Sequence, residues 1–133
     1  MTLSLSLAAR NMRLQALQQT IDSHASAAKL LVYGGVKPTP GAAANPANLI
    51  ATVTLAKPSC TVNDDLLEWL TPAEGKRVSD LDVSWVRIVT GDDQWVLDGT
   101  ASVVDGGGDF QFDTVEGNVG AFIRVASGGI SEP

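Results

Sequence analysis

The sequence predicts a mainly β protein, a β-sandwich of the jelly-roll kind with one N-terminal α-helix. Short apolar runs rich in Val, Ile, Thr and Trp recur after residue 29, and Gly, Pro and Asp turns separate them. Residues 84–102 contain two such runs, each with a tryptophan, on either side of a Gly-Asp-Asp turn. This arrangement is typical of a β-hairpin. Only a stretch near the start repeats its leucines at helical spacing.

A chain of 133 residues fits a single domain with its own core. Within that domain we distinguish three parts by their sequence patterns. Residues 1–7 form an extended arm, residues 8–24 a helix, and residues 29–126 the β-sandwich. No internal repeat is visible.

The arm alternates apolar and serine positions and has too little chain to bury itself. Its apolar residues are Leu3, Leu5 and Leu7. We expect the arm either to cap its own core or to add to the sheet edge of a neighbouring molecule. The helix that follows has Ser6 as its N-cap and an apolar face that reaches Ile21.

The β region is predicted from alternation and turn residues. The expected strands are residues 30–33, 49–55, 66–70, 84–90, 95–102, 110–115 and 119–125. The strands at 84–90 and 95–102 are expected to pair antiparallel. Residues 37–48 hold three prolines among Gly and Ala, so we expect an irregular surface loop there.

Composition excludes several classes of function. The net charge of −6 argues against nucleic-acid binding, which requires clustered basic residues. No apolar run approaches the roughly 20 residues that cross a bilayer, and no basic segment opens the chain as in a signal peptide. The single cysteine excludes an internal disulfide. We therefore expect a soluble protein that is used without export.

The charge is unevenly divided along the chain. Residues 1–60 carry five Lys/Arg and one Asp, whereas residues 61–133 carry four Lys/Arg and fourteen Asp/Glu. If the fold mixes the two halves, the asymmetry averages out. If it does not, copies are able to pack head-to-tail, or one half binds a partner of opposite sign.

Residues for catalysis are sparse. His24 is the one histidine and lies far in sequence from Cys60, with no local motif that joins them in a nucleophilic pair. Acidic pairs occur at Asp64-Asp65, Asp80 with Asp82, Asp92-Asp93, and Asp105 with Asp109. The last pair, with its intervening glycines, offers a calcium alternative, but tight turns select Asp and Gly for themselves. We expect no catalytic residue, no metal and no cofactor.

The three tryptophans have two interpretations. Trp85 and Trp95 lie inside apolar runs, so we expect both to lie in the core. Trp69 is next to Pro72, and its environment is left open. A surface tryptophan beside acidic loops would instead indicate a carbohydrate-binding module, the rival class of function.

The order of several segments resembles a family of small structural proteins of tailed bacteriophages. These segments are AARNMRLQAL, LLVYGGVKP, LIATVTLAKPS, SWVRIV and VLDGTAS. The resemblance spans residues 8–102 and weakens after residue 105. Residues 66–82 depart from it, because they are richer in Trp and charge than the small-residue stretch of that family.

The resemblance implies a non-enzymatic virion component. Within that class we expect a capsid decoration or cement protein on the head surface, assembled in the bacterial host cytoplasm, with a phage tail or fibre component as the alternative. The implied partners are the phage major capsid protein and further copies of this chain, as a homodimer or homotrimer. Contact residues expected from exposure, charge and lack of regular structure are Leu3, Leu5, Leu7, Arg10, Arg13 and Lys37.

Overall fold

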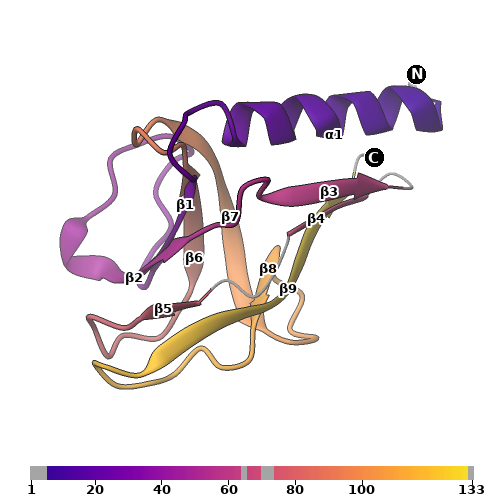
Figure 1. The fold of residues 1–133 in the computed structure, drawn as a ribbon. Coiled ribbons are helices and arrows are strands. Elements are labelled where there is room, and N and C mark those ends of the chain that lie inside the picture. The colour runs from indigo at the N-terminus through magenta and orange to yellow at the C-terminus, as the bar shows by residue number, and fades with distance from the viewer. Residues whose placement is uncertain (1–5, 64–65, 70–73, 132–133) are drawn as a thin grey trace.

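A computed structural model of the chain shows a mainly β fold with an N-terminal helix, as predicted (Figure 1). It describes residues 6–63, 66–69 and 74–131. In chain order the elements are α1 (Leu7–Ile21), β1 (Lys29–Tyr33), the 3-10 turn η1 (Pro46–Asn48), β2 (Leu49–Thr54), β3 (Cys60–Asn63), β4 (Leu66–Trp69), β5 (Glu74–Lys76), β6 (Trp85–Val89), β7 (Trp95–Val103), β8 (Phe110–Phe112) and β9 (Phe122–Ser131). Within these described ranges, no helix is long and apolar enough to cross a membrane.

The strands form one hydrogen-bonded path in the order β2-β1-β6-β7-β8-β9-β4-β3, and β5 pairs with β9. The predicted hairpin is confirmed, since β6 and β7 pair antiparallel with Ile88 opposite Leu97. The β7–β8 pair is parallel. The sheet curls until β5 lies against β2, where the Val78 amide donates to the Ile50 carbonyl at 2.7 Å.

A glycine permits this close approach of β5 to β2. A Cβ atom added to Gly75 would lie 2.7 Å from the Thr52 carbonyl oxygen, which is closer than real side chains come. The curled sheet encloses an apolar core to which most strands contribute. Its fully buried members include Leu30, Val32, Ile50, Val53, Val86, Ile88, Phe110, Phe112 and Ile123.

The helix α1 packs on the β3–β4 pair at one end of the sheet (Figure 1). Ser6 caps it as predicted, because the Ser6 Oγ accepts a hydrogen bond from the Ala9 amide at 3.1 Å. Leu14 and Ile21 are buried, and Gln18 Nε2 donates to the Cys60 carbonyl at 2.7 Å. These contacts fix the C-terminal half of the helix on the sheet.

Two expectations about the N-terminal part are revised. Leu7 begins the helix and does not belong to an extended arm, and it stays exposed. The helix ends at Ile21, slightly before the expected end at residue 24, where Asp22 forms the C-cap. Leu3 and Leu5 lie outside the described residues.

The β region also differs in places from the expectation. The short strands β3 and β5 were not predicted, because four and three residues are too few to show alternation. The last strand was expected at residues 119–125 within a region ending at 126, but β9 begins at Phe122 and continues to Ser131. The loop at 37–48 is irregular except for η1 at its end, where Pro46 fits the first helical position.

Candidate binding surface

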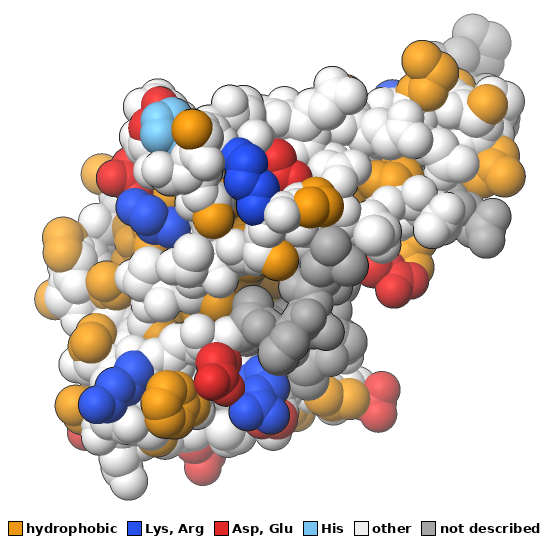
Figure 2. All heavy atoms as spheres, in the orientation of Figure 1, with side chains coloured by type: hydrophobic (Ala, Val, Ile, Leu, Met, Phe, Trp, Pro, Cys, Tyr) orange, Lys and Arg blue, Asp and Glu red, His pale blue; other side chains and the backbone are white. Residues whose placement is uncertain are grey.

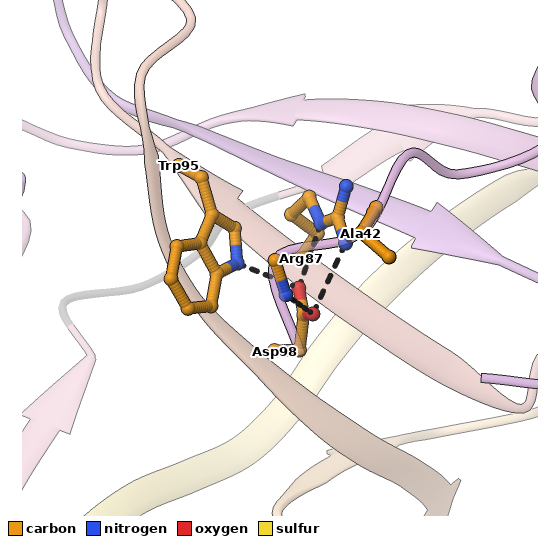
Figure 3. Close-up of polar contacts among 5 residues, drawn as sticks. Ala42, Arg87, Trp95 and Asp98 are labelled. Carbon is orange, nitrogen blue, oxygen red and sulfur yellow. Dashed lines mark hydrogen bonds and ion pairs between the residues drawn. The ribbon is translucent and has the colours of Figure 1, made fainter. Parts of the chain in front are cut away.

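The irregular loop at residues 37–48 is fixed to the sheet by a buried ion pair (Figure 3). Arg87 projects from β6 and Asp98 from the opposite position on β7. The Arg87 Nε atom lies 2.7 Å from Asp98 Oδ1, and Arg87 Nη2 lies 3.1 Å from Asp98 Oδ2. The two side chains are only 10% and 2% exposed. This two-point contact is the strong geometry for an arginine and a carboxylate.

The same two side chains hold the backbone of the loop. The Gly41 amide donates to Asp98 Oδ2 at 3.2 Å, and Arg87 Nη2 donates to the Ala42 carbonyl at 2.7 Å. Trp95 Nε1 completes the arrangement by donating to Asp98 Oδ1 at 3.0 Å. The loop is therefore held rigidly although it lacks regular structure. We call Arg87, Asp98, Trp95, Gly41 and Ala42 the loop cluster.

A pair of stacked aromatic rings lies beside Arg87 of the ion pair. Trp85 and Tyr33 stack with their centroids 4.5 Å apart and their planes at 12°. The Arg87 guanidinium carbon lies 5.3 Å from the Trp85 ring centroid, within the range of a cation–π contact. These contacts help to orient Arg87 and add rigidity to the loop cluster.

Gly41 is required by two features of its position. Its φ of +79° lies in the left-handed region that favours glycine. A Cβ atom there would lie 3.3 Å from Trp95 Cζ3, so the indole ring rests directly on the glycine. A Cβ atom at residue 41 would require the ring to shift by a few tenths of an ångström, and a larger side chain would collide with it.

The electrostatics follow from burial and hydrogen bonding. Burial acts to raise the pKa of Asp98, but hydrogen bonds from Arg87, Trp95 and Gly41 outweigh it and hold the pKa below its ordinary value. The hydrogen bond to Asp98 raises the pKa of Arg87. Burial raises the pKa of Tyr33. The ion pair therefore stays charged at neutral pH.

The loop cluster is suited to binding and not to chemistry. Each carboxylate oxygen of Asp98 already accepts two hydrogen bonds, so neither is available to a metal ion or to a proton in transfer. What the cluster presents outward is one face of Trp95, whose side chain is about half exposed, next to a rigid loop.

The structure places the expected contact residues on two separate elements. Leu7, Arg10 and Arg13 lie on the N-terminal part of α1, over the β3–β4 end of the molecule. Lys37 begins the loop that is fixed to β6 and β7. Figure 1 shows these two elements apart, so the structure does not bring the expected residues together into one site.

The two tryptophans expected in the core have different environments. Trp85 is buried, as expected, whereas the expectation for Trp95 is wrong because the side chain is 48% exposed. Trp95 is the first residue of β7, beside a register shift opposite Ile88 and Val89, and its ring turns outward over Gly41. The side chain of Trp69 lies outside the described part of the structure.

Cys60 and His24 do not form a catalytic pair in the structure. Cys60 is fully buried, its Sγ lies 3.4 Å from Ser59 Oγ, and burial raises its pKa. His24 Nδ1 instead accepts a hydrogen bond from the Ser26 amide at 3.0 Å. A buried neutral thiol is inert as a nucleophile.

The raised pKa of Cys60 leads to a prediction about alkaline stability. The unfolded chain loses the thiol proton first, near pH 8.5, so stability from the neutral thiol is present below about pH 8.5 and lost as pH rises further. Urea unfolding at neutral and alkaline pH should therefore show a smaller alkaline loss for Cys60→Ala than for the wild type. Tyr33 titrates in both proteins and cancels in this comparison. Equal losses would contradict the prediction.

Several of the acidic turn residues have hydrogen-bond partners in the part of the chain that the structure describes. Asp109 Oδ2 accepts hydrogen bonds from the Thr100 amide at 2.9 Å and from the Thr100 hydroxyl at 3.1 Å. Asp105 has a φ of 66°, as a turn residue does. Among the described residues no group of three or more His, Cys, Asp or Glu is placed to hold a metal ion. Asp64-Asp65 lies outside those residues.

The importance of Arg87 and Asp98 was missed from the sequence, although a signal was present. Arg87 interrupts the apolar run of β6, and a charge at a buried strand position requires a counter-charge. The hairpin register places Asp98 directly opposite it. An arginine inside a buried strand therefore predicts a carboxylate at the facing position of the paired strand.

Comparisons of this chain with protein-family models, curated proteins and solved structures find no match.

Proposed function

We propose that this protein is a non-enzymatic structural component of a bacteriophage virion, a decoration or cement protein that stabilises the head by bridging capsomers. Its partner is the phage major capsid protein, and its place is the capsid surface. The order of the segments between residues 8 and 102 supports this assignment, as does a small, mainly β fold with a helix at one end.

The observation that carries the proposal is the loop held by the loop cluster. An irregular proline-rich segment usually serves as a spacer, but here a buried ion pair fixes its backbone at two points. Fixing a loop in advance removes the ordering entropy that binding would otherwise cost. The exposed face of Trp95 beside the loop supplies an aromatic residue of the kind that dominates binding energy.

The proposal includes a finer class for the fold, a jelly-roll-like β-sandwich. It is supported by the curling of a single strand path until β5 meets β2 through the Val78–Ile50 hydrogen bond. Such a body is stiff and has exposed loops at its ends, which suits a protein that bridges neighbouring subunits.

Location on the virion is the decisive measurement. Electron cryomicroscopy of virions with and without the protein is expected to show difference density on the outer shell of the head. Density confined to the tail would replace the decoration role with that of a tail or fibre component. Purified protein added to heads that lack it is expected to restore the shell density.

One observation favours the rival carbohydrate-binding role, namely the exposed indole of Trp95. A rigid tryptophan with a free face is able to stack on a sugar ring. If this role holds, glycan-array binding disappears in Trp95→Ala while the fold stays intact. The decoration role instead expects no glycan binding by the wild type.

A further inference from the structure

Arg77 is a second buried arginine, and within the described residues it has no counter-charge. It directly follows β5, and only 2% of its surface is exposed. Its Nη2 donates to the Leu81 carbonyl at 2.6 Å, whereas its Nε and Nη1 are buried without a hydrogen-bond partner. A guanidinium keeps its positive charge in proteins, so a full charge lies beneath the surface with the donors of two nitrogens unused.

Two other arginines show what Arg77 lacks. Arg87 is also buried, but two of its nitrogens bind the Asp98 carboxylate. Arg124 is exposed and forms an ion pair with Glu74 at 2.9 Å. Figure 2 shows charged side chains of both signs side by side at the lower edge of the molecule, over β5 and the start of β9. Removing a charge from water without an opposite charge is strongly unfavourable, so the buried guanidinium calls for an anionic partner.

A short segment of backbone covers the Arg77 guanidinium. Gly117 rests on it, since an added Cβ atom there would lie 2.9 Å from Nε and 3.3 Å from Cζ. Residues 118–120 are exposed, and the Gly120 amide fixes their end by donating to the Arg77 carbonyl at 2.9 Å. Within the described part of the chain, the amides of residues 117–119 donate no hydrogen bond. An anion is therefore able to displace this segment and to use its amides as further donors.

We propose that Arg77 binds a small free oxyanion, such as phosphate or a carboxylate ion, beneath residues 117–120. A planar guanidinium matches two oxygens of one such group, which is how Arg87 binds Asp98. The ligand is a small ion because the unused nitrogens are enclosed by backbone. It supplies the charge that the surrounding side chains do not. The site is separate from the loop cluster, and the inference goes beyond the proposed function.

Urea unfolding at neutral pH tests the proposal, with sodium phosphate or sodium acetate added at constant ionic strength. A ligand that binds only the folded protein stabilises it by mass action, so the better of the two anions at about ten times its dissociation constant should lower the unfolding equilibrium constant about tenfold. This gain should disappear in Arg77→Met. Arg124→Met is the matched control, because Arg124 is exposed and already paired with Glu74. The control should keep the gain.

A second measurement needs no variant. In nuclear magnetic resonance titrations of the wild type with the same anions, the backbone amide signals of residues 117–120 should shift and saturate. Shifts elsewhere in the chain, or none, overturn the site. Equal gains in urea for the wild type and Arg77→Met, rising in proportion to salt concentration, also overturn it, because exclusion of salt from the protein surface then explains them. Neither result bears on the location of the protein in virions.

Discussion

Replacing Arg87 with methionine is expected to lower the free energy of unfolding by about 3–5 kcal/mol. The substitution keeps the apolar stem but leaves the Asp98 carboxylate, which is 2% exposed, without its counter-charge. It also removes the donor to the Ala42 carbonyl, so the loop loses one of its two fixed points. Urea unfolding followed by tryptophan fluorescence measures the loss.

Two further variants distinguish the effect of losing the ion pair from the effect of losing packing alone. Arg77→Met is the matched control, because Arg77 is also buried but within the described residues donates only to a carbonyl, with Nε and Nη1 unbonded. Arg77→Met should lower the free energy of unfolding clearly less than Arg87→Met does. The double variant Arg87→Met with Asp98→Leu should recover much of the stability, since an apolar pair of similar volume often replaces a buried ion pair without cost. Equal losses for Arg87→Met and Arg77→Met would refute the argument.

The same ion pair predicts how stability depends on pH. The pKa of Asp98 in the folded protein lies below its value in the unfolded chain, so its contribution is complete above about pH 4 and is lost as pH falls further. At neutral pH the variant Asp98→Asn should be less stable than the wild type. Between neutral and acidic pH its free energy of unfolding should fall less than that of the wild type. A variant that declines in parallel with the wild type would show that other carboxyl groups govern acid unfolding.

The sequence predicted those parts of the fold in which local pattern and tertiary structure agree. The hairpin of β6 and β7 follows from alternation and a Gly-Asp-Asp turn, and α1 follows from its Ser6 cap and leucine spacing. The parallel pairing of β7 with β8 was not predicted, because parallel strands usually need a crossover of a dozen residues or more and β8 has only three residues. β9 runs through Gly128 and Gly129, which by themselves indicate a turn.

The candidate site was harder to predict than the fold. The loop at 37–48 was correctly expected on the surface, but its fixation depends on Arg87 and Asp98, which meet only after the hairpin has formed. The expectation for Trp95 was wrong because its place in an apolar run indicated a core position. Its outward turn depends on the register shift near Val89 and on space above Gly41, and neither feature can be read from composition.

The second large effect is expected from Gly41→Val. The new side chain meets the Trp95 ring, which a Cβ atom alone would approach to 3.3 Å, and it strains a backbone with φ of +79°. We expect the loop to leave its position while the core, which lies on the other face of the sheet, stays folded. If the loop binds the capsid, occupancy on heads that lack the protein should fall by at least about tenfold.

The matched control for Gly41→Val is Gly107→Val. Gly107 has a similar φ of +87°, but nothing lies within 4 Å of an added Cβ atom, so this variant carries the backbone strain without the collision. Gly41→Val should therefore lose more stability than Gly107→Val in urea unfolding, and only Gly41→Val should lose capsid occupancy. Wild-type occupancy for Gly41→Val, with Trp95 fluorescence showing that the ring has moved, would exclude the loop as the capsid contact and leave α1, with Leu7, Arg10 and Arg13, as the remaining candidate.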